Sequence, residues 1–350
     1  MTHPPLKTAL VGFGRIASGY AEDPVMARYY RYATHAQVLA EHPAFDWIAV
    51  VDPDPSAREF AHTRWSVPIV AESVAALGAA AADIEVVVLA TRPETRLHAL
   101  DAFPNARVAL VEKPLGVTYA ESAAFLHECR SRNVQVQVNL WRRADRRFRA
   151  LAAGELAELV GDIQCASGVY GNGLANNGTH LVDFVRMLLG EVVAVECVGH
   201  AAPFEAGPIP GDVNPTFGLT LQSGAVVTLH PLRFEYYREN GLDIWGTDGR
   251  LAILNEGLTL SHYARDDNRA MTGEREIVCD APQSLESTVG NAFYHMFGNM
   301  ADAVNGTDEL WSPGDSALRC AQVVDATLLA LRTRTRVNLD EATFADAALR

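Results

Sequence analysis

The strongest constraint on the fold is an alternation in the first 140 residues between short apolar runs, rich in β-branched side chains, and segments of helical character. Continuous apolar strands separated by helices are typical of a parallel sheet that is covered on both faces. The sequence therefore predicts an α/β domain with a doubly wound parallel sheet. The expected strands are 8–12, 47–52, 67–70, 85–90, 107–111 and 134–140.

The second half of the chain has a different pattern. After an arginine-rich helical crossover at 142–159, many strands follow one another, joined by hairpin-like turns such as Gly246–Gly249. This pattern indicates a large, open, mostly antiparallel sheet, followed by helices near 284–304 and 313–334. We therefore predict two domains, 1–141 and 142–350. The expected strands of the second are 163–170, 192–199, 216–221, 225–232, 242–245, 250–254, 258–263 and 275–279.

Composition excludes several classes of partner. A formal net charge of -14 argues against broad attraction to nucleic acid or to an anionic membrane. The first residues lead directly into a strand, without a signal segment or an apolar run of spanning length, so a cytoplasmic location is expected. Five scattered cysteines without metal-ligand spacing indicate small buried side chains, and neither they nor the histidines suggest a metal site. The cysteines are Cys129, Cys165, Cys197, Cys279 and Cys320.

A glycine-rich turn, GFGRIA, follows the first strand and opens the next helical segment. Gly12 permits the tight turn, Gly14 lets the backbone approach a pyrophosphate, and the small Ala17 allows close packing of helix on strand. The start of a helix would supply free amide groups for the phosphates. The alternative is a tight turn with no ligand. The cofactor-binding residues expected here are Gly12, Phe13, Gly14, Arg15 and Ile16.

Asp52, at the end of the second strand, favours NAD over NADP, because a carboxylate there accepts hydrogen bonds from the ribose and repels a 2′-phosphate. It lies 40 residues after Gly12, against about 20 in the usual pattern. The surplus lies between Gly19 and Thr34. This insertion is either a lid that contacts an anionic substrate or a surface or oligomer-contact loop. In the first case Arg28 and Arg31 would bind a phosphorylated or nucleotide-linked substrate.

Lys113 is the candidate catalytic residue. It lies in the run VEKPLG after the fifth strand, at the carboxyl edge of the sheet, where ligands of such folds bind. Only two of the 29 basic residues are lysines. A lysine in a chain that prefers arginine suggests chemistry that needs a group able to lose its proton. The alternative is an incidental loop lysine.

Four motifs together resemble the Gfo/Idh/MocA oxidoreductase family over nearly the whole chain. They are GFGRIA at 12–17, ATRP at 90–93, EKP at 112–114 and GTHLVD at 178–183. The resemblance implies an N-terminal Rossmann domain (1–141) and a C-terminal α+β domain (142–350) for substrate binding and oligomerisation. We expect a homodimer or homotetramer formed through the C-terminal sheet.

The resemblance also implies roles for individual residues. Lys113 would reach both the nicotinamide and the reacting hydroxyl, and the Lys113-Pro114 bond would be cis, which only about 5–6% of such bonds are. The further cofactor contacts expected are Thr91, Arg92, Pro93, Glu112 and Asn139.

His180 would be a general acid or base, because histidine exchanges protons near neutral pH. It opens a helix that runs to Leu189, and Asp183 lies on the same face, where it either orients the imidazole or stabilises the helix start. Many relatives carry an aspartate four residues before this histidine, but here the residue is Asn176. Without that carboxylate His180 should be a weaker base, so we expect Lys113 to be the main proton donor.

The expected activity is hydride transfer between NAD and a carbinol or keto carbon of a sugar, cyclitol or nucleotide sugar, in a biosynthetic pathway. One alternative is a glycoside hydrolase that uses NAD transiently, with no net redox change. The other is a non-catalytic NAD(P)-binding sensor, although a sensor has no need for Lys113 and His180. The expected substrate contacts are Lys113, Arg143, Tyr170, Asn172, Asn176, Asn177 and His180.

Overall fold

The computed structural model describes residues 3–201 and 207–339, and the chain divides into two compact units. The first consists of 1–145 and 290–318, and the second of 146–289 and 319–350. We expected the domain boundary after residue 141, and the structure has it after residue 145. The sequence did not predict that 290–318 returns to the N-terminal unit. Within the described ranges, no helix is both long and apolar enough to cross a membrane.

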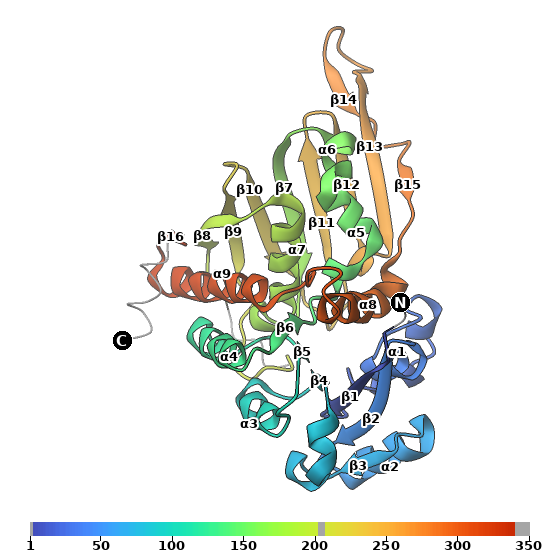
Figure 1. The fold of residues 1–350 in the computed structure, drawn as a ribbon. Coiled ribbons are helices and arrows are strands. Elements are labelled where there is room, and N and C mark those ends of the chain that lie inside the picture. Colours follow the sequence, from blue (N-terminus) through green and yellow to red (C-terminus); the bar gives the residue numbers. More distant parts are fainter. Residues whose placement is uncertain (1–2, 202–206, 340–350) are drawn as a thin grey trace. The chain divides into compact units, whose positions relative to one another are not determined.

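The first unit contains a six-stranded sheet in the order β3-β2-β1-β4-β5-β6, with every pair parallel (Figure 1). The doubly wound sheet expected from the alternating pattern is thereby confirmed. The apolar runs of two interior strands, VVVL in β4 and VALV in β5, are buried along their whole length. The strands are β1 Leu6–Val11, β2 Phe45–Val51, β3 Ile69–Ala71, β4 Val86–Leu89, β5 Val108–Val111 and β6 Gln135–Val138.

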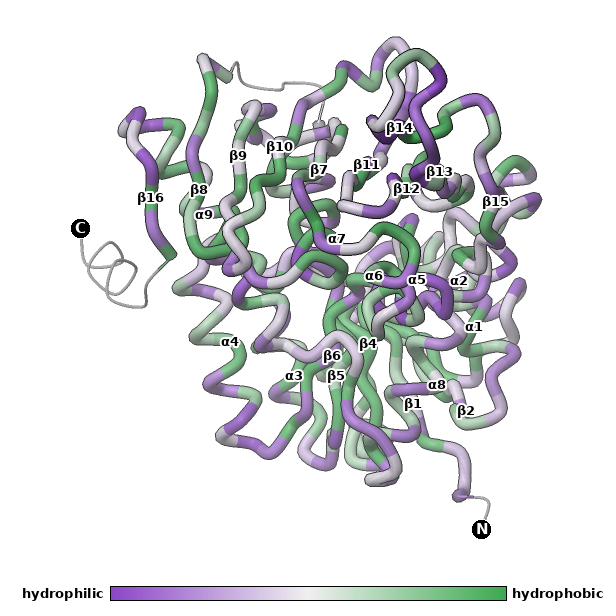
Figure 2. Tube along the Cα trace, turned by 90° about the horizontal axis from the view of Figure 1, so that it is seen from above, coloured by the Kyte–Doolittle hydropathy of each residue, from purple (hydrophilic) through white to green (hydrophobic). Residues whose placement is uncertain are grey.

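Helices cover both faces of this sheet. Alternate strand residues enter different cores: Val11 joins the core that includes Phe125 of α4, whereas Leu10 joins the core that includes Phe297 of α8. Figure 2 shows the hydrophobic colour following these strands. The return of α8 to the first unit therefore completes one face of its sheet. The helices are α1 His35–Glu41, α2 Pro55–Trp65, α3 Arg96–Asp101, α4 Tyr119–Ser131 and α8 Ala292–Val304.

The second unit contains a ten-stranded sheet in the order β14-β13-β12-β11-β7-β10-β9-β8-β16, with β15 also paired to β13. The described pairs are antiparallel except β7 with β10, so the mostly antiparallel sheet is confirmed. The strands are β7 Ile163–Tyr170, β8 Val192–Val198, β9 Thr216–Leu221, β10 Val226–Pro231, β11 Gly241–Gly246, β12 Gly249–Leu254, β13 Thr259–Asp267, β14 Arg275–Ile277, β15 Gln283–Leu285 and β16 Val337–Asn338.

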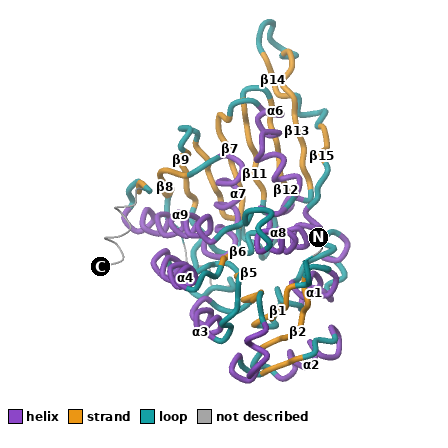
Figure 3. The backbone as a smooth tube through the Cα atoms, in the orientation of Figure 1, coloured by secondary structure: helices purple, strands orange, loops and turns teal. Residues whose placement is uncertain are grey.

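Helices lie against one face of the second sheet, and Figure 3 shows the β13–β14 hairpin extending beyond the neighbouring strands. The helix expected from 284 starts only at Ala292, because β15 occupies the beginning of that range. Two cysteines expected to be buried, Cys165 and Cys279, are exposed. Cys165 is on the outward side of β7, where alternation places every second residue. The helices are α5 Arg146–Ala150, α6 Leu156–Val160, α7 Thr179–Leu189 and α9 Gly314–Thr333.

Candidate functional site

The glycine turn after β1 is built for close approach. Gly12 has φ +86°, and a Cβ there would lie 2.8 Å from the carbonyl oxygen of Ala90, so only glycine fits. Gly14 has open space where its Cβ would be. The first glycine thus lets the turn pack on the end of β4, and the second leaves the backbone accessible to a ligand.

The helix expected directly after this turn is interrupted. Ser18 N–H donates to the carbonyl of Gly14, which closes one turn. The chain then leaves the helix at residues 19–34 and returns as α1, where His35 and Ala36 donate to the carbonyls of Ile16 and Ala17. The insertion predicted from the spacing therefore separates the first helical turn, which follows Gly14, from the rest of the helix, which is α1.

Side-chain contacts hold parts of the insertion to α1 and α2, and Glu22 Oε1 lies 3.1 Å from Arg64 Nε of α2. Arg31 Nη2 lies 3.3 Å from Glu41 Oε2, and the Tyr32 hydroxyl donates to the same oxygen. Glu41 is at the end of α1 away from the glycine turn, so Arg31 is held there, and Arg28 is exposed.

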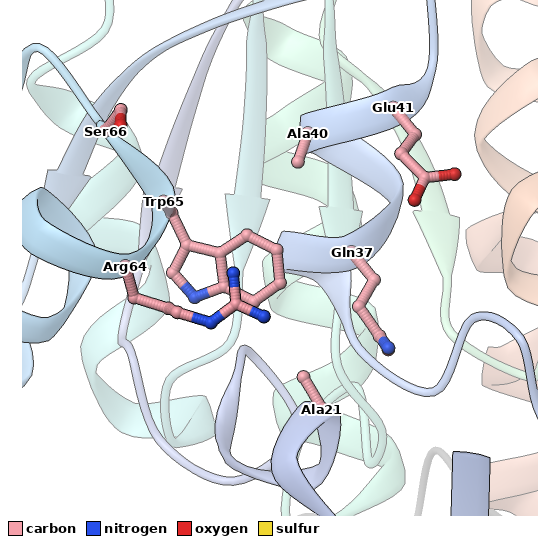
Figure 4. A pocket seen from close by; sticks show the side chains of 7 residues that line it. All are labelled: Ala21, Gln37, Ala40, Glu41, Arg64, Trp65 and Ser66. Carbon is pink, nitrogen blue, oxygen red and sulfur yellow. The ribbon is translucent and has the colours of Figure 1, made fainter.

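A hollow of about 370 Å³ opens beside the contact between Arg31 and Glu41 (Figure 4). Its lining residues are Ala21, Gln37, Ala40, Glu41, Arg64, Trp65 and Ser66.

Asp52, just after β2, is bonded to the glycine turn. Its Oδ2 accepts from the backbone N–H of Phe13 at 2.6 Å, and its Oδ1 accepts from that of Asp54 at 2.9 Å. The Phe13 side chain is in the core, so only its backbone can face a cofactor. These bonds fix the carboxylate beside the turn, in the place from which it can accept from a ribose.

The EKP loop follows β5, and its Lys113-Pro114 bond is cis, as expected. The carboxylate of Glu112 is buried behind the loop, where Oε1 accepts from Asn139 Nδ2 at 2.6 Å and lies 2.9 Å from His35 Nε2. Burial alone would raise the pKa of Glu112, but the hydrogen bond and charge of His35 and the bond from Asn139 hold it below its usual value. The carboxyl is thus an anion at the sheet edge.

Arg96, which no motif indicated, ties two loops at this edge together. Its Nη1 donates to the carbonyls of Pro114 and Leu115, at 2.5 and 3.1 Å, and its Nε and Nη2 donate to that of Thr91, at 3.2 and 2.9 Å. The side chain is 1% exposed, and burial lowers the pKa of Arg96 to about 10, against the opposing charges of Glu112 and Glu94. Because the guanidinium of Arg96 donates to both, it fixes the EKP loop to the loop after β4.

Thr91 Oγ1 and Asn139 Oδ1, in the loops that follow β4 and β6, are buried and have no partner among the described residues. Buried polar atoms are normally hydrogen-bonded, so such a pair indicates a ligand that supplies the missing groups. With the open space at Gly14 and the carboxylate of Asp52, they fit a dinucleotide. Arg92 is exposed and Pro93 half-buried in the same loop.

In the second unit, the GTHLVD motif lies at the start of α7, preceded by a π-helical turn at Leu174–Gly178. Asp212 braces this turn, because its carboxylate accepts from the N–H groups of Ala175 and Asn176. Asn177 Nδ2 is buried and has no partner within the described ranges. His180, in the first turn of α7, is partly exposed. Wide helical turns of this kind are frequent at functional sites.

Asp183, on the same helix, is 2% exposed, and its Oδ1 lies 3.7 Å from Arg186 Nη1. Arg186 also pairs with Glu191 through two bonds of 2.9 Å. Asp183 and Arg186 therefore form a buried charged pair on α7, which Arg186 extends to the partly exposed Glu191. An orienting role of Asp183 toward His180 stays a prediction.

The substrate contact expected from Tyr170 is wrong. Its side chain is fully buried, and its hydroxyl donates to the carbonyl of Pro215 at 2.6 Å, so it supports the strand end instead. Burial raises the pKa of Tyr170 far above its usual value. Asn172, in the turn that follows, is partly exposed with φ +57°. Arg143 is half-buried in the short helix Trp141–Ala144 of the first unit.

Two family models match the chain. The model of the oxidoreductase family with an NAD-binding Rossmann fold, GFO_IDH_MocA, matches residues 6–140, and that of the GFO/IDH/MocA C-terminal domain matches 164–252. The chain belongs to the Gfo/Idh/MocA oxidoreductase family. The resemblance of the four motifs is thereby confirmed, as are the enzyme class and NAD as the cofactor. No curated protein matches this Gfo/Idh/MocA chain in sequence.

Solved structures share the whole fold. The WlbA dehydrogenase from Chromobacterium violaceum, with NADH and UDP-GlcNAcA, has a TM-score of 0.73 at 20% identity, over 97% of this chain and 98% of that one. Levoglucosan dehydrogenase with NADH and levoglucosan gives 0.74 at 20%, over 96% and 100%. An oxidoreductase from Agrobacterium radiobacter with NAD+, L-tartaric acid and magnesium gives 0.71 at 18%, over 95% and 98%.

Proposed function

We propose that this Gfo/Idh/MocA oxidoreductase transfers a hydride between NAD and a carbinol or keto carbon of a sugar, cyclitol or nucleotide sugar. The observation that carries the proposal is the arrangement at the edge of the first sheet. Lys113, Thr91 and Asn139 follow the neighbouring strands β5, β4 and β6, and Thr91 Oγ1 and Asn139 Oδ1 are buried without a partner among the described residues. Bound NAD would supply the hydride acceptor or donor at this edge.

The chain's own residues would hold and orient the cofactor. The turn at Gly12 and Gly14 would receive the pyrophosphate, and Asp52 the adenosine ribose. Thr91 Oγ1 and Asn139 Oδ1 would bond the nicotinamide half. Arg96 would keep the two loops that carry these contacts at a constant separation, because its donors bond both.

Proton handling is assigned to Lys113, with His180 as its assistant. The amine of Lys113 would hold the reacting oxygen and exchange its proton, which arginine cannot do at neutral pH. Asn176 offers no charge that would stabilise a protonated His180, so the imidazole should be the weaker base. Asn176 and Asn177 would bond substrate hydroxyls, and this role is supported by Nδ2 of Asn177, which is buried without a partner among the described residues.

Two of the similar structures were solved with a nucleotide sugar and an anhydrosugar, which supports a sugar-like substrate. The test is to identify small molecules retained by the purified protein by mass spectrometry, and to assay them, with a panel of sugars and nucleotide sugars, for NADH formation. We expect NADH and oxidised product in equal amounts. Hydrolysis without net redox change would favour a glycoside hydrolase, and inertness toward every compound with intact NADH binding would favour a sensor.

A further inference from the structure

A histidine outside every motif holds the carboxylate next to Lys113. The Nε2 of His35, the first residue of α1, lies 2.9 Å from Glu112 Oε1, and Asn139 Nδ2 donates to the same oxygen at 2.6 Å. His35 is 1% exposed and Glu112 is 8% exposed. Side chains from α1 and from the residue after β6 therefore meet at one oxygen of Glu112, the first residue of the EKP motif.

Packing leaves the imidazole little freedom. Its ring centroid lies 5.4 Å from that of Phe293 and 5.8 Å from that of Phe297, both on α8. Its other nitrogen, Nδ1, is buried without a hydrogen-bond partner among the described residues. An unsatisfied buried polar atom costs about 1–3 kcal/mol. An apolar side chain would fill the same space without that cost, so the bond to Glu112 is what the imidazole adds.

The other charged groups at Glu112 have different roles. Lys113 follows it in the chain, and its charge lowers the pKa of Glu112. The guanidinium of Arg96 also acts on this carboxylate through its charge, but it donates its hydrogen bonds to the carbonyls of Thr91, Pro114 and Leu115. His35, by contrast, reaches the carboxylate from α1 and bonds it directly.

We propose that His35 is a positioning residue that holds the carboxylate of Glu112 in place and thereby sets the protonation of Lys113. The inference rests on the proposed function for the importance of Lys113. An ionised carboxylate next to Lys113 favours the ammonium form of its side chain. Without the bond from His35, the carboxylate would be held by Asn139 without its second partner, and its charge would act less strongly on Lys113, which would then lose its proton at a lower pH.

The test measures the protonation of Lys113 without substrate or cofactor. Trace acetic anhydride is applied to the full chain across a pH series, and acetylation of each lysine is followed by mass spectrometry. The only other lysine is Lys7, which is 44% exposed and paired with Asp83, so it is an internal control. In His35→Phe, which keeps a ring against α8 but has no donor, the Lys113 midpoint should fall by about one pH unit. The Lys7 midpoint should not move.

His35→Gln separates a positioning role from a packing role. Its side-chain amide can donate to Glu112 in place of Nε2, so its Lys113 midpoint should stay near that of the wild-type chain. An unchanged midpoint in His35→Phe, or an equal fall in both variants, would overturn the proposal.

If His35→Phe does not fold, Glu112→Gln tests the same link. It should lower the Lys113 midpoint by itself, and adding His35→Gln to it should cause no further change. A wild-type midpoint in Glu112→Gln would also overturn the proposal. Because labelling needs no turnover, a chain that is inert toward sugars but shows these shifts would contradict the proposed function and leave the role of His35 standing.

Discussion

The backbone N–H of Phe13 donates to Oδ2 of Asp52 at 2.6 Å, so the carboxylate that should select the cofactor is bonded to the turn that should bind its phosphates. The two parts of the cofactor site are thus fixed to each other by one hydrogen bond. Since a charged acceptor makes such a bond stronger than a neutral one, the position of the carboxylate depends little on the bound ligand.

Replacement of Asp52 by alanine should weaken NAD+ binding about tenfold, which is the loss of about 1.4 kcal/mol. NADP+ should lose less affinity or gain some, because the charge that repels its 2′-phosphate is gone. Titration calorimetry with both cofactors measures this. Asp54→Ala is the matched control, since Asp54 caps α2 and should not affect the ratio. An equal loss for both cofactors would mean that Asp52 only supports the turn.

Arg96→Met should lower the free energy of unfolding by about 3 kcal/mol or more, because three backbone carbonyls would lose the buried, charged donor that bonds them. NAD+ binding should weaken as well, since the loops after β4 and β5 would no longer be joined. Urea unfolding gives the first quantity. Arg130→Met, at an exposed pair with Asp315, is the control and should cost less than about 1 kcal/mol. Similar losses in both variants would contradict the role of Arg96.

The sequence predicted the first unit well because its signals are local. Buried strands such as β4 and β5 are continuous apolar runs, and the glycine turn and the EKP motif are contiguous. Arg96 and His35 escaped prediction because their bonds join residues far apart in the chain. Nothing in the sequence near His35 indicates that its ring lies against α8 and reaches Glu112.

Tyr170→Phe should destabilise the second unit by about 1–2 kcal/mol, because the carbonyl of Pro215 would lose its buried donor. Tyr237→Phe, at a side chain 63% exposed, should change stability by less than about 0.5 kcal/mol. Neither substitution should change KM. A raised KM in Tyr170→Phe with unchanged stability would restore the substrate contact that its position at the end of β7 suggested.

The error at Tyr170 shows what pattern alone misses in the second unit. The end of a strand was identified correctly, but alternation does not reveal whether a side chain there points into the core. The brace from Asp212 to the turn before α7 was missed for a similar reason, since 37 residues separate Asp212 from Ala175.

Burial lowers the pKa of His42 to about 4, and the imidazole is neutral in the fold, where Nδ1 accepts from the N–H of Ala44. The unfolded chain binds a proton near pH 6.5, so unfolding takes up a proton between these values and acid lowers stability. The loss should reach up to about 3 kcal/mol as the pH falls from 6.5 to 4.

Urea unfolding across this pH range, in the wild-type chain and in His42→Gln, measures the effect, which should be absent in the variant. The exposed His98 supplies the control His98→Gln, which should keep the wild-type slope. Parallel curves for the wild-type chain and His42→Gln would show that His42 is not the group responsible.

The most direct test of the account compares turnover in Lys113→Ala and His180→Ala, on a substrate that the retained-ligand analysis identifies, with NAD+ affinity measured alongside. Loss of a general acid or base costs about 10²–10⁴-fold in rate. We expect Lys113→Ala to lose at least as much turnover as His180→Ala while it still binds NAD+. A larger loss in His180→Ala would make the histidine the principal acid or base and contradict the central role of Lys113.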